Sequence, residues 1–108
     1  MAEIALVHGL WNRGWMMASM AKRLRARGHH VRVFSYPTRS ASLDGHADGL
    51  HEFLNQHGTE ELHLVGHSMG GLVILNLFSR YDDLPPGRVV LMGTPVKGSN
   101  VVKRLAKL

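Results

Sequence analysis

Short apolar runs alternate along this chain with longer segments in which apolar residues recur at helical spacing. The runs are nearly continuous and are bounded by glycine, proline or polar residues. Such runs are typical of strands that are buried on both faces of a parallel sheet. They predict strands at residues 4–7, 31–34, 62–65 and 88–92.

The segments between these runs predict three helices. Apolar residues recur on one face of the first, at Trp15, Met16, Met20 and Leu24, and Gly28 is a suitable C-terminal stop. The second has its stripe at Leu43, Ala47, Leu50 and Leu54 and is expected to end at Gly58. The third, over residues 69–80, is apolar almost all round, which predicts deep burial. Residues 101–108 have the pattern of the start of a fourth helix.

Alternation of strands and helices predicts an α/β fold, a three-layer αβα sandwich around a short parallel sheet with right-handed crossovers. We expect residues 1–108 to form one domain. An apolar share of 44% argues against a disordered chain. No apolar run approaches the roughly 20 residues of a membrane span, and no secretory leader follows Met1, so a cytoplasmic location is expected.

The net charge of +5 is unevenly distributed. Residues 1–40 carry seven Lys or Arg and only one acid, residues 41–83 carry seven acids and one Arg, and residues 84–108 add five bases. A basic balance raises the hypothesis of a module that binds nucleic acid or an anionic membrane. Four of these cations, however, gather at one helix end, where they complement the helix dipole, and a solvated face is the interpretation that we favour. No nucleic-acid partner is expected.

The motif that carries chemistry is Gly66-His67-Ser68-Met69-Gly70, which matches G-x-S-x-G between a predicted strand and a predicted helix. A serine on such a sharp, strained turn presents its hydroxyl above the sheet. The flanking glycines remove Cβ atoms that would collide there, and Gly71 allows the helix and the strand to approach closely. His8-Gly9-Leu10, directly after the first strand, stands where an oxyanion loop belongs.

Together these segments resemble bacterial esterases and lipases of the α/β-hydrolase superfamily. Val7–Trp11 resembles their oxyanion loop and Val65–Gly71 their nucleophile elbow. Gly93–Ser99 resembles the G-[TA]-P-x-x-G-S segment that follows the next strand in many lipases. The resemblance covers nearly the whole chain and implies the local strand order 2-1-3-4.

The resemblance also implies roles for individual residues. Ser68 would attack an ester carbonyl, and the backbone N–H groups of Leu10 and Met69 would hold the oxyanion. Trp11 and Trp15 are candidates for the wall of an acyl pocket. The substrate would be a small-molecule or lipid ester, with no cofactor.

The chain departs from the family pattern in its catalytic triad, which runs Ser, then Asp or Glu, then His. After Ser68 the chain has only Asp82 and Asp83 as acids and no histidine. Both aspartates follow the third helix, at the end of the sheet opposite Ser68. We therefore expect an N-terminal portion of a longer hydrolase, with an incomplete triad and impaired activity. His8 is interpreted as a loop residue rather than as a base.

Other chemistry is disfavoured. The chain has no cysteine, and His46, His51 and His57 lack the spacing of a helical metal site, so no metal is expected. Two alternatives remain: a non-catalytic αβα module, and an acyltransferase or thioesterase of the same superfamily. The strand at residues 88–92 is expected to form an apolar sheet edge, which favours a homo-oligomer.

Overall fold

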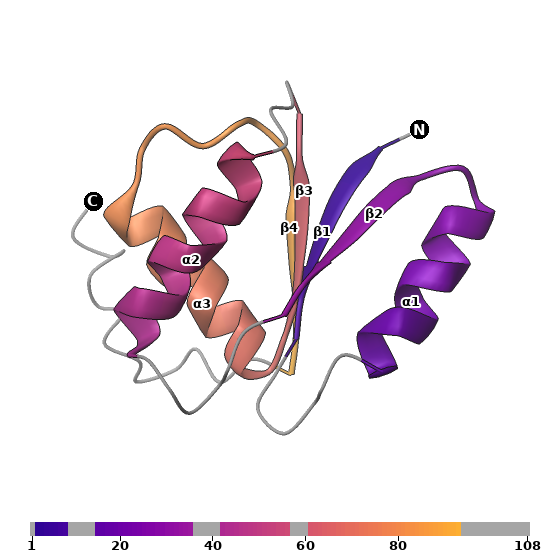
Figure 1. Ribbon diagram of the computed structural model, residues 1–108, viewed down its shortest axis with the longest axis horizontal. Coiled ribbons are helices and arrows are strands. Elements are labelled where there is room, and N and C mark those ends of the chain that lie inside the picture. Colours follow the sequence, from indigo (N-terminus) through magenta and orange to yellow (C-terminus); the bar gives the residue numbers. More distant parts are fainter. Residues whose placement is uncertain (1, 9–14, 36–41, 57–60, 94–108) are drawn as a thin grey trace.

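The computed structural model describes residues 2–8, 15–35, 42–56 and 61–93. Their elements, in chain order, are β1 (Glu3–Val7), α1 (Trp15–Ala26), β2 (His30–Phe34), α2 (Leu43–Asn55), β3 (His63–His67), α3 (Met69–Arg80) and β4 (Val89–Met92). Helix α1 covers one face of the sheet, and α2 and α3 cover the other (Figure 1). The predicted three-layer αβα sandwich is confirmed.

The four strands are parallel and lie in the order β2-β1-β3-β4, as the family resemblance implied. Strand β1 is central, and alternate side chains enter the two layers. Ile4 and Leu6 pack with α1, whereas Ala5 and Val7 join the larger cluster beneath α2 and α3. Burial on both faces explains why the sequence of this strand is continuously apolar.

Helix α1 ends as its sequence predicts. Gly28 has a φ of +91°, a left-handed conformation that a side chain disfavours. Its N–H donates to Arg25 O at 3.0 Å, and the His29 N–H donates to Leu24 O at 3.3 Å. This pair of bonds is a Schellman motif, which satisfies carbonyl groups left open at the end of the helix.

Strand β3 is longer than predicted, and the prediction of its end at residue 65 was wrong. It runs to His67 because parallel pairing with β4 continues past the apolar run, with Gly66 opposite Leu91 and His67 opposite Met92. Helix α2 ends at Asn55. Gly58 and the predicted helix over residues 101–108 lie outside the described residues.

Helix α3 is not buried on all sides. Val73, Ile74 and Leu77 face the core, but Phe78 is 37% exposed. The helix also buries one polar residue completely, Asn76. Its Nδ2 donates to Asp44 Oδ1 of α2 at 2.5 Å, so the buried amide links the two helices that cover this face of the sheet.

Polar contacts hold the C-terminal end of α3 against α2. Arg80 donates from Nε and Nη2 to the two carboxylate oxygens of Asp48, each at 2.9 Å, and the Tyr81 hydroxyl donates to Asp48 at 2.6 Å. The His51 ring stacks on the Tyr81 ring, with centroids 3.6 Å apart and planes at 7°. His51 Nε2 lies 3.0 Å from Asp83 Oδ1.

These contacts predict a pH-dependent contribution to stability. The hydrogen bond from Arg80, and then the one from Tyr81, lower the pKa of Asp48 below 3.8. A carboxyl group whose pKa is lower in the folded state stabilises the fold above its unfolded pKa and loses this effect as the pH falls through the folded pKa.

We predict that Asp48→Asn lowers the free energy of unfolding at neutral pH, by the roughly 0.2–1 kcal/mol typical of exposed ion pairs. The difference from wild type should disappear at acid pH, because the wild-type carboxyl is then protonated. Urea unfolding at both pH values measures it. Glu52→Gln, also on α2, is the matched control and should show little change. A pH-independent loss in Asp48→Asn would contradict the assignment.

Candidate active site

Ser68 occupies the turn between β3 and α3, at the carboxyl edge of the sheet. Its φ of 54° and ψ of −120° give it the only positive φ among the described residues other than glycine. Such a backbone costs on the order of 1–3 kcal/mol and persists only where the surroundings impose it. The strained conformation predicted from the G-x-S-x-G motif is confirmed.

Two backbone hydrogen bonds impose this conformation. The Ser68 N–H donates to Met92 O of β4 at 2.8 Å, and the Gly71 N–H donates to Ser68 O at 3.0 Å. The first bond continues the β3–β4 ladder by one residue beyond the strand. Sequence reasoning did not find the part that Met92 plays, because that depends on the register between two strands far apart in the chain.

The flanking glycines are required by close packing. A Cβ on Gly66 would lie 2.7 Å from the Cα and N atoms of Gly71 and 2.8 Å from Ile74 Cδ1. These separations are well inside van der Waals contact, so the backbones of β3 and α3 touch directly. The predicted role of Gly71 in a close helix–strand approach is confirmed.

Gly70 brings a third element to the turn. A Cβ there would collide with the Val7 carbonyl oxygen and lie 2.6 Å from His8 O. The end of β1 therefore lies against the first turn of α3. His8, which is only 4% exposed, is thus placed beside the serine turn, as expected of the residue that begins the loop after β1.

The other predicted site residues are only partly described. Met69 begins α3 and packs, half-buried, against the larger core cluster. Its N–H belongs to the helix terminus, where amide groups lack intrahelical acceptors and the helix dipole is positive. Leu10 and Trp11 lie outside the described residues. Trp15 begins α1, but its side chain is also outside them.

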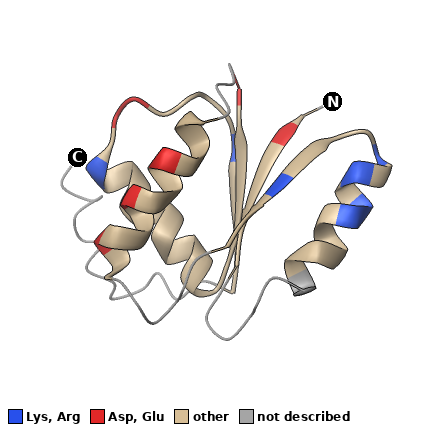
Figure 2. Ribbon diagram, viewed as in Figure 1, with Lys and Arg blue, Asp and Glu red and all other residues tan. Residues whose placement is uncertain are grey.

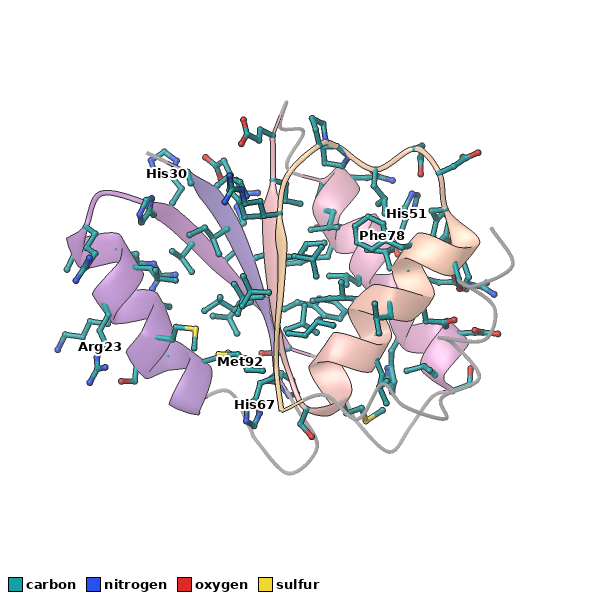
Figure 3. The ribbon with its side chains drawn as sticks, turned by 180° about the vertical axis from the view of Figure 1, so that it is seen from behind. Arg23, His30, His51, His67, Phe78 and Met92 are labelled. Atoms are coloured by element: carbon teal, nitrogen blue, oxygen red, sulfur yellow. The ribbon has the colours of Figure 1, made fainter. Side chains whose placement is uncertain are left out.

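His67 lies on the other side of β3 from the glycine contacts. Strand alternation places it on the α1 face, next to Met92 of the adjacent strand (Figure 3). Its Nδ1 is buried and finds no hydrogen-bond partner within the described residues. His67 therefore points toward the layer of α1, away from the contacts between β3 and α3.

The two acids that follow Ser68 in sequence lie at the far end of α3. That helix has 12 residues, or about 18 Å of length, between the serine turn and the loop that holds Asp82 and Asp83 (Figure 1). Asp83 is engaged there with His51. The predicted separation of these acids from the serine is confirmed. Within the described residues no group of three His, Asp or Glu side chains could hold a metal ion.

Comparison with known proteins agrees with this geometry. The model of the alpha/beta hydrolase family matches residues 4–107. The chain belongs to this family. It spans about a third of the length of the curated relatives that it matches.

Two curated proteins are similar in sequence to this family member. A carbendazim hydrolyzing esterase from a Nocardioides species is 36% identical over 89 residues, which are 74% of this chain and 37% of the esterase. Ethanol acetyltransferase 1 from Cyberlindnera fabianii is 28% identical over 103 residues, or 87% of this chain and 30% of the transferase. The similarity to the esterase supports a relationship to hydrolases of the esterase type.

Solved structures share the fold. An extracellular alpha/beta-hydrolase from a Paenibacillus species, described as sharing structural and functional homology with tobacco salicylic acid binding protein 2, aligns with a TM-score of 0.75 and 23% identity over 87% of this chain and 41% of its own. The product of gene lin2722 from Listeria innocua aligns with a TM-score of 0.69 and 17% identity, over 88% and 52%. Among the described helices, none is long and apolar enough to cross a membrane.

The contact between α3 and β1 generates a prediction. Gly70→Ala should lower the free energy of unfolding by about 1–3 kcal/mol, because the added methyl group collides with backbone that has no room to move. Gly49→Ala is the matched control. It is also a helical glycine, but its added Cβ would meet only Phe34 Cζ, at an ordinary 3.5 Å.

The control should be neutral or should stabilise by roughly 0.5–1 kcal/mol, the usual gain of alanine over glycine in a helix. Urea unfolding followed by circular dichroism measures both variants. Equal effects of the two substitutions would show that the contact at Gly70 is not a constraint.

Proposed function

We propose that this chain carries the nucleophile of a serine hydrolase that cleaves carboxylic esters through a Ser68 acyl-enzyme. The observation that carries the proposal is the strained Ser68 backbone, at the junction of β3, α3 and the end of β1. Backbone strain of this kind clusters at active sites, and membership of the alpha/beta hydrolase family supports the same interpretation.

In the proposed reaction, Ser68 Oγ attacks the ester carbonyl carbon and gives up its proton to a general base. The carbonyl oxygen becomes an oxyanion, which the N–H groups of Met69 and Leu10 would hold. Each such donor is worth about 3 kcal/mol of transition-state stabilisation. The bond to the alkoxy group then breaks and the leaving oxygen takes the proton, which leaves the acyl group on Ser68 for water to release.

The substrate that we propose is a small-molecule or lipid ester, with Trp11 and Trp15 as candidates for the acyl pocket. The proposal has two versions, which differ in the molecule that accepts the acyl group from Ser68. Similarity to the esterase favours water, whereas similarity to the ethanol acetyltransferase favours an alcohol. Both versions share the Ser68 acyl-enzyme, so the first test is acylation itself.

We predict that the chain reacts at Ser68 with an activated ester such as p-nitrophenyl acetate, in a slow burst without robust steady-state turnover. The reason is that the described acids after Ser68 lie at the far end of α3, and a serine without a positioned base is a poor nucleophile. Mass spectrometry of the quenched protein should find one acetyl group on the peptide that contains Ser68.

Ser68→Ala should abolish the burst, and Ser79→Ala, at the other end of α3, should leave it unchanged. Equal bursts in the two variants would remove Ser68 from the mechanism and favour the non-catalytic αβα module. Robust steady-state hydrolysis would reveal a base close to the serine, and His8→Ala would be the next variant to test.

We also propose that the chain associates through β4. No described residue pairs with the outer edge of this strand, and Val89 and Val90 are 39% and 51% exposed. Unpaired apolar edges recruit strands of other chains, and a lysine on the edge opposes this pairing.

The prediction is therefore a dimer or a larger species at micromolar concentration, shifted toward monomer by Val90→Lys. Sedimentation equilibrium measures the change. Gln56→Lys adds the same charge at the exposed end of α2 and should not alter the equilibrium. A wild-type monomer would refute the association, and an equal shift in both variants would attribute it to charge rather than to the edge.

A further inference from the structure

The charges of this protein are divided between the outer layers of the sandwich. The Lys and Arg residues of α1 gather toward its C-terminal end, while α2 on the opposite side carries acids (Figure 2). The basic end of α1 consists of Lys22, Arg23, Arg25 and Arg27, all of them exposed. Helix α1 and the turn that follows it contain no acid at all.

Several acids elsewhere have a basic side chain as partner. Asp44 and Asp48 are paired with Arg80, and Asp83 with His51. On β1, one carboxylate oxygen of Glu3 lies 2.6 Å from His30 Nδ1 and the other lies 3.7 Å from Arg32 Nη2. The cation paired with Glu3 is therefore Arg32 of β2, not a residue of α1.

The basic end of α1 has no comparable compensation. No carboxylate among the described residues lies within ion-pair distance of Lys22, Arg23 or Arg27. Arg25 donates to a backbone carbonyl, Val31 O, at 2.7 Å. This bond orients the side chain, but a carbonyl group does not neutralise the positive charge of the guanidinium. The helix dipole, on which the solvated-face interpretation of the sequence relied, supplies a partial charge of only about −0.5 against these four cations. Most of their charge is therefore open to an anionic partner. Arg23 extends outward from the ribbon, away from the sheet (Figure 3).

We propose that the basic end of α1 is an electrostatic contact surface for an anionic lipid bilayer. Its cations are spread over the outside of a helix end, without aromatic side chains among them. Stacking on single-stranded bases needs exposed aromatic rings, and duplex DNA presents phosphates at fixed positions. The headgroups of a fluid bilayer move laterally, so they can meet cations at irregular spacing. Each such cation strengthens attachment by about fivefold.

This attachment leaves the serine turn facing solution. Ser68 lies at the carboxyl edge of the sheet, and α1 runs from that edge to its basic end over 12 residues, or about 18 Å. The surface therefore tethers the protein rather than delivering the bilayer to the elbow. The inference is independent of ester hydrolysis, since it uses no residue of the proposed active site.

The test is co-sedimentation of the 108-residue chain with sucrose-loaded vesicles of phosphatidylcholine alone or with about a third of phosphatidylserine. Binding is expected only with the anionic lipid. It should fall steeply as the salt is raised from about 0.05 M to about 0.5 M, because screening shortens the reach of the charges. Binding that is equal on both kinds of vesicle, or insensitive to salt, would overturn the proposal.

Variants locate the surface. Arg23→Gln should weaken partitioning about fivefold, and the triple variant with Lys22→Gln, Arg23→Gln and Arg27→Gln by about a hundredfold. Arg88→Gln removes the same charge from an exposed position preceding β4 and should have much less effect. Circular dichroism of each variant checks the fold. Equal losses in Arg23→Gln and Arg88→Gln would show that net charge, not this surface, drives binding.

Two further outcomes would each replace the bilayer by another partner. Binding to a short DNA duplex that exceeds binding to the anionic vesicles, and that is lost in the triple variant, would identify nucleic acid. Self-association without vesicles that weakens with salt and with Arg23→Gln would identify the acidic layer of a second copy. Sedimentation velocity at both salt concentrations distinguishes that case.

Discussion

Direct backbone contact between the first turn of α3 and the sheet is the constraint on which the site depends. Gly66 of β3 lies against Gly71, and Gly70 lies against the carbonyl groups at the end of β1. No side chain separates these segments, so small shifts of the helix are excluded. A serine placed between such contacts has little choice of conformation, and its positive φ follows from the packing around it rather than from its own preference.

The same helix is held at its other end by polar groups. Two contacts connect α3 to α2 at the end of α3, about 18 Å from Ser68: the Arg80–Asp48 pair and the stack of His51 on Tyr81. A third, the hydrogen bond from the Asn76 amide, lies between that end and Ser68. Glycine contacts thus fix the start of α3 and hydrogen bonds fix its end. The strain at Ser68 is opposed by contacts along the whole length of the helix, which shows how the fold can maintain an unfavourable backbone conformation.

Charge and site are separated in space. The serine turn lies at the carboxyl edge of the sheet, whereas the uncompensated cations gather at the far end of α1. This separation lets the two surfaces act independently. A contact made by the basic end of α1 would leave the elbow and the end of β1 unobstructed.

The sequence by itself determined the type and order of the elements, because the buried faces of a strand or helix require apolar residues at a regular local spacing. The continuous apolar run at residues 4–7 needs a strand covered on both faces, and the stripe from Leu43 to Leu54 needs a helix. The stop at Gly28 is likewise local, since it is set by residues within one turn. The elbow motif around Ser68 can be recognised from five consecutive residues, although the strain at Ser68 is imposed by packing with distant strands. The strand order came from resemblance to a family, not from the pattern.

Only the tertiary structure decided what depends on residues distant in sequence. The true end of β3 at His67 and the bond from Ser68 to Met92 O follow from the register with β4, about 25 residues later in the chain. The burial of Asn76 could not be foreseen, because its partner Asp44 belongs to another helix. The exposure of Phe78 likewise differs from the deep burial predicted for the helix over residues 69–80. Local sequence encodes which face of an element is apolar, but only packing determines which surface meets that face.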